Sequence, residues 1–282
     1  MFDNIFQVVS GTVVGRDHVH DGRNNQDAFH VLEDSSLFVA VVCDGCGDSS
    51  HSEVGALIGS RLVASAVARY TKMLPESSYM HLAASEFWER IRQDVMAQIR
   101  VLAHQMGESL SEVITKHFLF TIVGTLITQK ISIFFCLGDG TMFVNGERFH
   151  IGPYPNNAPP YLSYGLVETT QDYDAEDLRF RIPLVIPTDQ LESFLIGTDG
   201  VEDIINAEHK TLPGKEEAIE TIDLLWSDSR YFRNRSLLQR RLNLMNAEAR
   251  IPDWDRKAID RHMGLLHDDT TLVVARRLRS EE

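Results

Sequence analysis

Residues 37–56 read LFVAVVCDGCGDSSHSEVGA, and this stretch decides how the rest of the chain is interpreted. Seven apolar residues, ending at Cys43, run directly into Asp44 and Gly45 and then into a loop of small polar side chains. A short apolar run bounded in this way predicts a buried strand. An Asp-Gly pair after a strand is typical of a tight turn. Whether Asp44 also has a chemical role depends on what the remaining sequence places beside it.

The composition is that of one folded domain spanning residues 1–282. Hydrophobic residues make up 43% of the chain and charged residues 24%, and the length is close to the upper limit for a single core. The formal charge of −14 disfavours nucleic acid and anionic membranes and suits divalent cations. The chain contains no long uncharged apolar segment, and its start, MFDNIFQ, does not resemble a secretory signal. We therefore expect a cytoplasmic protein that binds neither nucleic acid nor membranes.

The three cysteines, Cys43, Cys46 and Cys136, are too few for a disulfide framework. The C-x-x-C spacing of Cys43 and Cys46 fits a redox motif or half of a zinc site. The sequence lacks a second Cys/His pair at ligand spacing, and a thiol at the end of an apolar strand is ordinarily a buried one. The buried thiol is the favoured interpretation, and the redox or zinc role is the alternative.

Short apolar runs rich in β-branched and aromatic residues recur along the chain and predict strands. The link Gln129-Lys130 has only two residues, so the strands on either side of it should pair antiparallel. The predicted strands are residues 5–14, 28–32, 37–43, 118–128, 131–137, 180–186, 193–198 and 271–275.

Two long helices are predicted between the early and the middle strands. Ser50 and Glu53 form a capping-box pattern, after which apolar residues follow at helical spacing to about Met73. A second amphipathic stripe covers residues 78–106. We also expect a loop over residues 153–165 and a helix over residues 236–247. This order of elements predicts an α+β fold with antiparallel sheets and helices packed on their outer faces.

Three apolar runs end in the same Asp-Gly dipeptide, and further acidic residues flank other strands. Strand ends and neighbouring strand starts lie at the same edge of an antiparallel sheet, so these carboxylates can meet. Converging carboxylates repel one another unless cations are present, and oxygen ligands favour Mg²⁺ or Mn²⁺ over zinc. A single Asp-Gly pair indicates only a turn, so spacing alone leaves a set of turns and a metal site both open. The acidic residues are Asp27, Asp44, Asp139, Asp199, Asp268 and Asp269.

Six motifs, in this order, resemble those of the PPM, or type 2C, metal-dependent Ser/Thr protein phosphatases, especially their compact bacterial branch. The resemblance spans about residues 10–276 and implies an antiparallel β-sandwich flanked by helix pairs, in α-β-β-α layers. It also implies hydrolysis of phosphoserine or phosphothreonine on proteins. The motifs are NNQDA (24–28), VVCDGCG (41–47), VGT (123–125), LGDG (137–140), GTDGVED (197–203) and DDTT (268–271).

The resemblance further implies a site for two Mn²⁺ or Mg²⁺ ions, with a water between them that attacks phosphorus. Asp44 would bridge both ions and the nucleophilic water, and Gly45 would offer its carbonyl. Asp199 and Asp268 would hold one ion, and Asp27 would support the other. In some members of the family a third, weaker ion is bound at the positions of Asp139 and Asp203.

The chain departs from the family pattern near the substrate. The position of the usual phosphate-binding arginine is Gly22, so Arg23 and Arg16 are the candidates for that role. His51 is the candidate general acid, and His18 and His20 also lie near the motifs. These departures support an alternative, a catalytically weak or inactive regulatory or binding module with the same fold.

The implied partners are a phosphorylated protein substrate and a cognate Ser/Thr kinase. A basic cluster stands out against the acidic background, and it is interpreted either as a solvated helix face or as a docking surface for a phosphorylated or acidic segment. The cluster consists of Arg230, Arg233, Arg235, Arg240 and Arg241.

Overall fold

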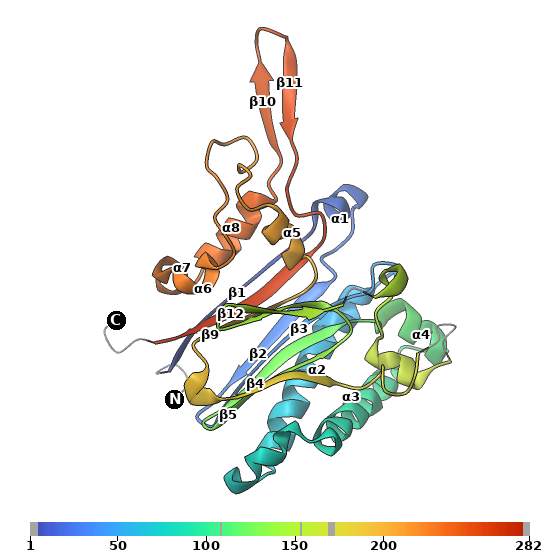
Figure 1. The fold of residues 1–282 in the computed structure, drawn as a ribbon. Helices are drawn as coiled ribbons and strands as arrows, with labels where there is room; N and C mark the ends of the chain where they lie inside the picture. Colours follow the sequence, from blue (N-terminus) through green and yellow to red (C-terminus); the bar gives the residue numbers. More distant parts are fainter. Residues whose placement is uncertain (1–4, 108, 153, 169–172, 279–282) are drawn as a thin grey trace.

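The computed structural model describes residues 5–107, 109–152, 154–168 and 173–278. Two five-stranded antiparallel sheets face each other, and helices cover their outer faces (Figure 1). The first sheet has the order β1-β12-β9-β6-β7 and the second has the order β2-β3-β4-β5-β8. The strands of the first sheet are β1 (Phe6–Val13), β12 (Thr270–Arg277), β9 (Ser193–Gly197), β6 (Gly140–Val144) and β7 (Glu147–Ile151). Those of the second are β2 (Asp27–Glu33), β3 (Leu37–Asp44), β4 (Ile122–Thr128), β5 (Ile131–Leu137) and β8 (Arg181–Pro187).

Strand β3 is buried on both faces, which explains its unbroken apolar sequence. Val39 and Val41 pack under the helices, whereas Phe38 and Ala40 pack between the two sheets. Successive side chains of a strand point to opposite faces, so both faces of this strand require apolar residues. The predicted sandwich of antiparallel sheets with helices on its outer faces is therefore confirmed.

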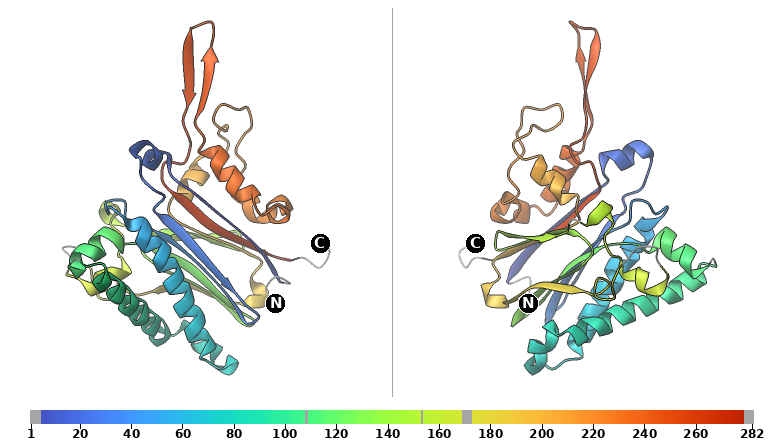
Figure 2. Two further views of the ribbon diagram at one scale, coloured as in Figure 1. Left: turned by 180° about the vertical axis from the view of Figure 1, so that it is seen from behind. Right: turned by 45° about the vertical axis from the view of Figure 1, so that its right-hand side comes forward.

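The helices form two outer layers. On the second sheet lie α2 (Ser52–Lys72), α3 (Ser85–Gln105) and α4 (Leu110–His117). On the first sheet lie α5 (Val201–Asn206), α6 (Leu224–Ser227), α7 (Ser229–Arg233) and α8 (Leu237–Met245). A short helix α1 (Arg16–Asp21) follows β1, and a hairpin of β10 (Ala249–Asp253) and β11 (Ala258–His262) projects from the body (Figure 2). Among the described helices, none is long and apolar enough to cross a membrane.

The capping box predicted at Ser50 is wrong. Helix α2 begins at Ser52 after His51, and no side chain caps its first turn. The Glu53 carboxylate instead accepts a hydrogen bond from Asn24 (3.1 Å), and Ser52 Oγ donates to the Cys46 carbonyl (2.9 Å). Both side chains thus tie the helix to the loops around it rather than to its own backbone.

Other expectations need smaller corrections. The second helix is not continuous from residue 78, because a 3₁₀ helix at Glu76–Ala83 ends before α3 begins at Ser85. Strands β6, β7, β10 and β11 were not predicted. The antiparallel pairing across Gln129-Lys130 is confirmed, and so is the helix predicted at 236–247, which spans Leu237–Met245. The predicted loop at 153–165 contains short 3₁₀ turns, and its first residue, Pro153, lies outside the described residues.

Candidate metal centre

Strand pairing brings the acidic residues to one end of the sandwich. Asp44 is the last residue of β3 and Asp27 is the first of β2, and the antiparallel register places them directly opposite each other. In the other sheet, Asp199 follows β9 and Asp268 precedes β12, and these two strands are paired neighbours. Asp139 lies just before β6, which pairs with β9 on its other side. Like charges opposite each other destabilise a sheet, so this register indicates a bound counter-charge.

Four of these residues, Asp44, Asp139, Asp199 and Asp268, line a cavity of about 230 Å³. The cavity lining includes Gly45, which has room for no side chain. A Cβ atom there would lie 2.8 Å from both the Gln26 carbonyl oxygen and Ser52 Oγ. A second cavity of about 510 Å³ shares Asp139, Asp199 and Asp268 with the first and adds Asp203. The structure thus brings together most of the residues predicted as ligands.

The pKa values of these carboxyl groups are raised. Burial and then the Asp268 carboxylate raise the pKa of Asp199 to about 7. Burial, followed by the Asp199 and Asp27 carboxylates, raises the pKa of Asp44 well above its ordinary value. Burial also raises the pKa values of Asp139 and Asp268. Mutual repulsion in a partly dehydrated site is relieved either by protons or by cations.

Carboxylate oxygens that accept no hydrogen bond test whether cations would fit this site. Asp27 accepts a hydrogen bond from Thr198 Oγ1 (2.7 Å) through Oδ2, but its buried Oδ1 has no partner among the described residues. Within the described chain, no hydrogen bond reaches the Asp44 carboxylate. A buried carboxylate oxygen without a donor, such as Asp27 Oδ1, is costly unless it binds a cation, and the half-buried Asp44 carboxylate is open to one. The donors from the aspartates and the Gly45 carbonyl are oxygens, which fits Mg²⁺ or Mn²⁺. His18 also lines the cavity and adds one nitrogen donor beside Asp268 and Asp269.

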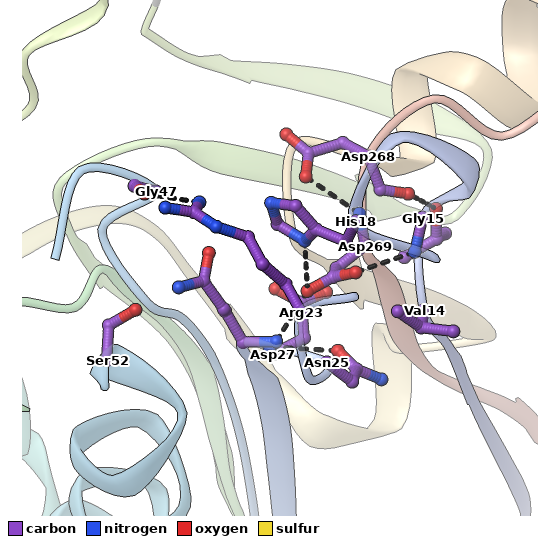
Figure 3. A network of polar contacts seen from close by, with 12 residues as sticks. Val14, Gly15, His18, Arg23, Asn25, Asp27, Gly47, Ser52, Asp268 and Asp269 are labelled. Atoms are coloured by element: carbon purple, nitrogen blue, oxygen red, sulfur yellow. Dashed lines mark hydrogen bonds and ion pairs between the residues drawn. The ribbon is translucent and has the colours of Figure 1, made fainter. Parts of the chain in front are cut away.

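Asp269 has a different role from its neighbour Asp268. Its side chain is buried, and its two oxygens accept hydrogen bonds from the backbone nitrogens of Gly15 (2.6 Å) and Gln26 (2.5 Å). The same carboxylate lies 3.0 Å from His18 Nδ1 (Figure 3). Asp269 therefore fixes α1 and the start of β2 around the cavity. Apart from a second acid beside Asp268, nothing in the sequence indicates this role.

Asp203, from α5, holds the segment before β12. Its Oδ2 accepts hydrogen bonds from the backbone nitrogens of His267 (2.5 Å) and Asp268 (3.1 Å). These bonds orient Asp268, while Asp203 still lines the larger cavity. The structure thus places Asp203 at the site through a loop contact that its sequence motif did not predict.

The two arginine candidates lie differently. Arg23 donates from Nη1 to the Gly47 carbonyl (2.6 Å), over the loop that follows Asp44 (Figure 3). Arg16 is turned toward the segment before β12, where Nη1 donates to the Gly264 carbonyl (3.0 Å) and Nη2 lies 2.6 Å from His267 Nδ1. Of the two, Arg23 is the one attached to a residue of the smaller cavity.

The structure also distinguishes between the histidine candidates for the general acid. His51 has a side chain that is 58% exposed, and its ring stacks on His117 with the centroids 5.3 Å apart. It does not line the smaller cavity, whereas His18 does. Sequence reasoning also missed Asn157 and Tyr161, which line this cavity from the loop before β8. The only signal in their segment is its density of Pro and Asn, which predicts a loop and no site.

Comparison with known proteins agrees with this geometry. The sequence profile of the family described as Protein phosphatase 2C matches residues 14–242. The fold is similar to that of a bacterial serine phosphatase, at 16% identity and a TM-score of 0.50, with 98% of each chain covered. It is also similar to the photosystem II phosphatase PBCP, at 13% identity and a TM-score of 0.50, with 98% of this chain and 99% of that chain covered. No curated protein matched the sequence. With the family profile covering most of its length, the chain belongs to the protein phosphatase 2C (PPM) family.

Proposed function

We propose that this protein hydrolyses phosphoserine or phosphothreonine on proteins in a reaction that depends on Mn²⁺ or Mg²⁺. The observation that carries this proposal is the convergence of Asp44, Asp199 and Asp268 on one cavity with raised pKa values. Membership of the family supports phosphatase chemistry, and the chain's own residues support the metal dependence.

The residues that would hold two cations are Asp44, the Gly45 carbonyl, Asp199, Asp268 and Asp27. Asp139 and Asp203 line the larger adjoining cavity, where a third ion would bind. When bound, the cations would supply a water of lowered pKa between them for attack on phosphorus and would neutralise the phosphoryl oxygens.

The protein's own groups would position the substrate and move a proton. Arg23 is anchored at the carbonyl of Gly47, a residue of the smaller cavity's lining, and would orient the phosphoryl group from there. His18 lines that cavity, and its Nδ1 faces the Asp269 carboxylate, which leaves Nε2 to donate a proton to the departing seryl or threonyl oxygen. We place His18 ahead of His51 in this role because the exposed His51 is not part of the cavity lining.

The alternative is a regulatory or binding module with the same fold and little or no turnover. Gly22, at the C-terminal cap of α1, supplies no side chain where the family has its phosphate-binding arginine. This alternative predicts weak metal binding and no phosphate release, whereas the proposed phosphatase must bind the metal and release phosphate.

The test is phosphate release from a phosphothreonine peptide, with Mn²⁺ or with EDTA. We expect release that depends on Mn²⁺, and a loss of at least about 100-fold in Asp44→Asn. Asp189→Asn, an exposed acid outside both cavities, is the matched control and should keep its rate. Metal binding by calorimetry separates the two functions. Weak or absent Mn²⁺ binding together with no phosphate release would favour the regulatory module, and the same rate in EDTA would refute the metal-dependent reaction.

The proposal also includes a phosphoprotein substrate made by a Ser/Thr kinase, and a cytoplasmic location for the reaction. Fractionation of cells that express the tagged protein would check the location. Comparing phosphoproteins in cells with the active protein and with Asp44→Asn would identify the substrate.

A further inference from the structure

The β10–β11 hairpin stands apart from the rest of the molecule. It projects beyond the sandwich near α1 and α5, and its two strands pair with each other and with no other described strand (Figures 1 and 2). Two-stranded hairpins are marginally stable alone in water. An arm of this kind usually gains stability from a partner.

Large apolar side chains are exposed along this arm. Trp254, at the turn between the strands, is 84% exposed, and Ile259 is 62% exposed. Ile251 is also exposed, on the opposite face of the hairpin, and so is Met263, which follows the end of β11. Scattered apolar side chains are ordinary on a protein surface, but Trp254 and Ile259 lie close together in sequence around the turn of this projecting element, and such exposure at one end of an arm marks an interaction site.

The charges of the hairpin are divided between its two faces. The register places Arg250 directly opposite Arg261, with the Pro252–Ile259 pair two positions along on the same face. We call these four residues the arginine face. Arg256, in the turn, forms ion pairs with both Asp253 and Asp260 and offsets part of their negative charge.

The arginine face lacks a full counter-charge in the described structure. Glu248 pairs with Arg250 (2.6 Å), and Arg261 has no carboxylate within ion-pair distance among the described residues. Like charges opposite each other destabilise a hairpin. An anionic partner would remove this repulsion.

The arm is also connected to the metal centre. His262, the last residue of β11, lies six positions before Asp268. Each five-residue strand spans roughly 17 Å. A substrate peptide with its phosphorylated side chain in the cavity would therefore need about five or more extended residues to reach the arm. The rest of the chain is strongly acidic and would repel an anionic segment.

We propose that the arginine face docks an acidic segment of the phosphoprotein substrate, held by Arg250 and Arg261 and by contact with Ile259 and Trp254. This inference rests on the proposed phosphatase function and adds a preference for acidic residues at a distance from the phosphorylated residue. Because the interaction is partly electrostatic, it weakens as salt rises.

The experiment uses two phosphothreonine peptides that differ only beyond a spacer of about six residues, one with a run of glutamates and one with a run of serines. We expect kcat/KM to be about tenfold higher for the glutamate peptide at low salt. The double variant Arg250→Glu/Arg261→Glu should lose this advantage and keep its rate on p-nitrophenyl phosphate. The matched control Arg90→Glu/Arg100→Glu carries the same charge change on the exposed face of α3 and should keep the advantage.

A binding measurement separates this inference from the proposed function. A fluorescent peptide with the same glutamate run and an unphosphorylated threonine should bind wild type and lose at least about tenfold in affinity with Arg250→Glu/Arg261→Glu. Binding without hydrolysis of either phosphopeptide would refute the phosphatase function and leave the docking surface standing. Equal kcat/KM for both peptides, or the same loss in the α3 control, would overturn the docking surface. It would also be overturned by tighter binding of a single-stranded RNA of equal charge, or by a dimer in ultracentrifugation that only the hairpin variant disrupts.

Discussion

Asp199→Asn should change how the stability of this protein depends on pH. Burial and the Asp268 carboxylate raise the pKa of Asp199 to about 7 in the folded protein, against an ordinary value of 3.8. The folded state therefore binds more protons than the unfolded chain between these pH values. It follows that, without divalent cations, this group lowers the free energy of unfolding as pH rises from about 4 to 7. The pKa difference corresponds to at most about 4 kcal/mol above pH 7.

The assay is thermal unfolding in EDTA between pH 5 and 8. For a domain of this size each kcal/mol shifts Tm by roughly 2–4 °C, so Asp199→Asn should unfold at most about 8–16 °C higher than wild type at pH 8. At pH 5 wild type has lost only about a third of this stability, so the difference in Tm should shrink in proportion. The difference between the two curves reports Asp199 together with its effect on neighbouring carboxyl groups, because the Asp199 carboxylate also raises the pKa of Asp44.

Mn²⁺ should reverse the order of stability. Wild type gains from binding the ions, whereas Asp199→Asn lacks one of the carboxylates that would hold them. Asp189→Asn is again the control and should follow wild type in both buffers. The reasoning would be refuted if Asp199→Asn were less stable than wild type in EDTA at pH 8. That result would mean that repulsion between carboxylates does not limit stability at this site.

Close contacts in the structure lead to three further predictions. Asp269→Ala would leave two backbone N–H groups without their acceptor, so the free energy of unfolding measured in urea should fall by about 2–5 kcal/mol. Asp269→Asn keeps one acceptor and should lose less. Gly55→Ala would place a Cβ atom 2.0 Å from the His117 carbonyl oxygen, so it should lower the free energy of unfolding by about 1–3 kcal/mol. An unchanged urea midpoint would contradict this packing. Arg23→Ala should raise KM for a phosphopeptide about tenfold, while Arg16→Ala, whose guanidinium is turned toward Gly264 and His267, should change KM much less.

The sandwich could be predicted because its decisive signals are local. Continuous apolar runs ending in Asp or Gly mark the buried strands, and the two-residue link at Gln129-Lys130 leaves only an antiparallel pairing. Two amphipathic helices between the strands require a sheet to cover. Each of these inferences needs only the spacing of residues within about twenty positions.

Features that depend on contacts between separate segments could not be predicted in this way. Glu53 was expected to cap its own helix, but its carboxylate bonds to Asn24 from another loop. Asn145-Gly146 is a strong hairpin signal, yet the strands on either side of it have only five residues each, and β7 is mostly polar and partly exposed. The β10–β11 hairpin has few apolar residues in alternation. Most of its side chains are exposed, so its sequence lacks the apolar–polar alternation that marks a half-buried strand.

Asp268 and Asp269 show where sequence reasoning about a metal site reaches its limit. Both are acidic, both are adjacent to the same strand, and either could have been a ligand. The structure separates them by their hydrogen bonds, because both oxygens of Asp269 already accept from backbone nitrogens. Asp268 lines the cavity, and its own backbone nitrogen and that of His267 are held by Asp203. Asp269 thus holds the backbone around the site, whereas the carboxylate of Asp268 lines the cavity. Only the register of β12 against β1 and β9 determines which of the two acids takes each role.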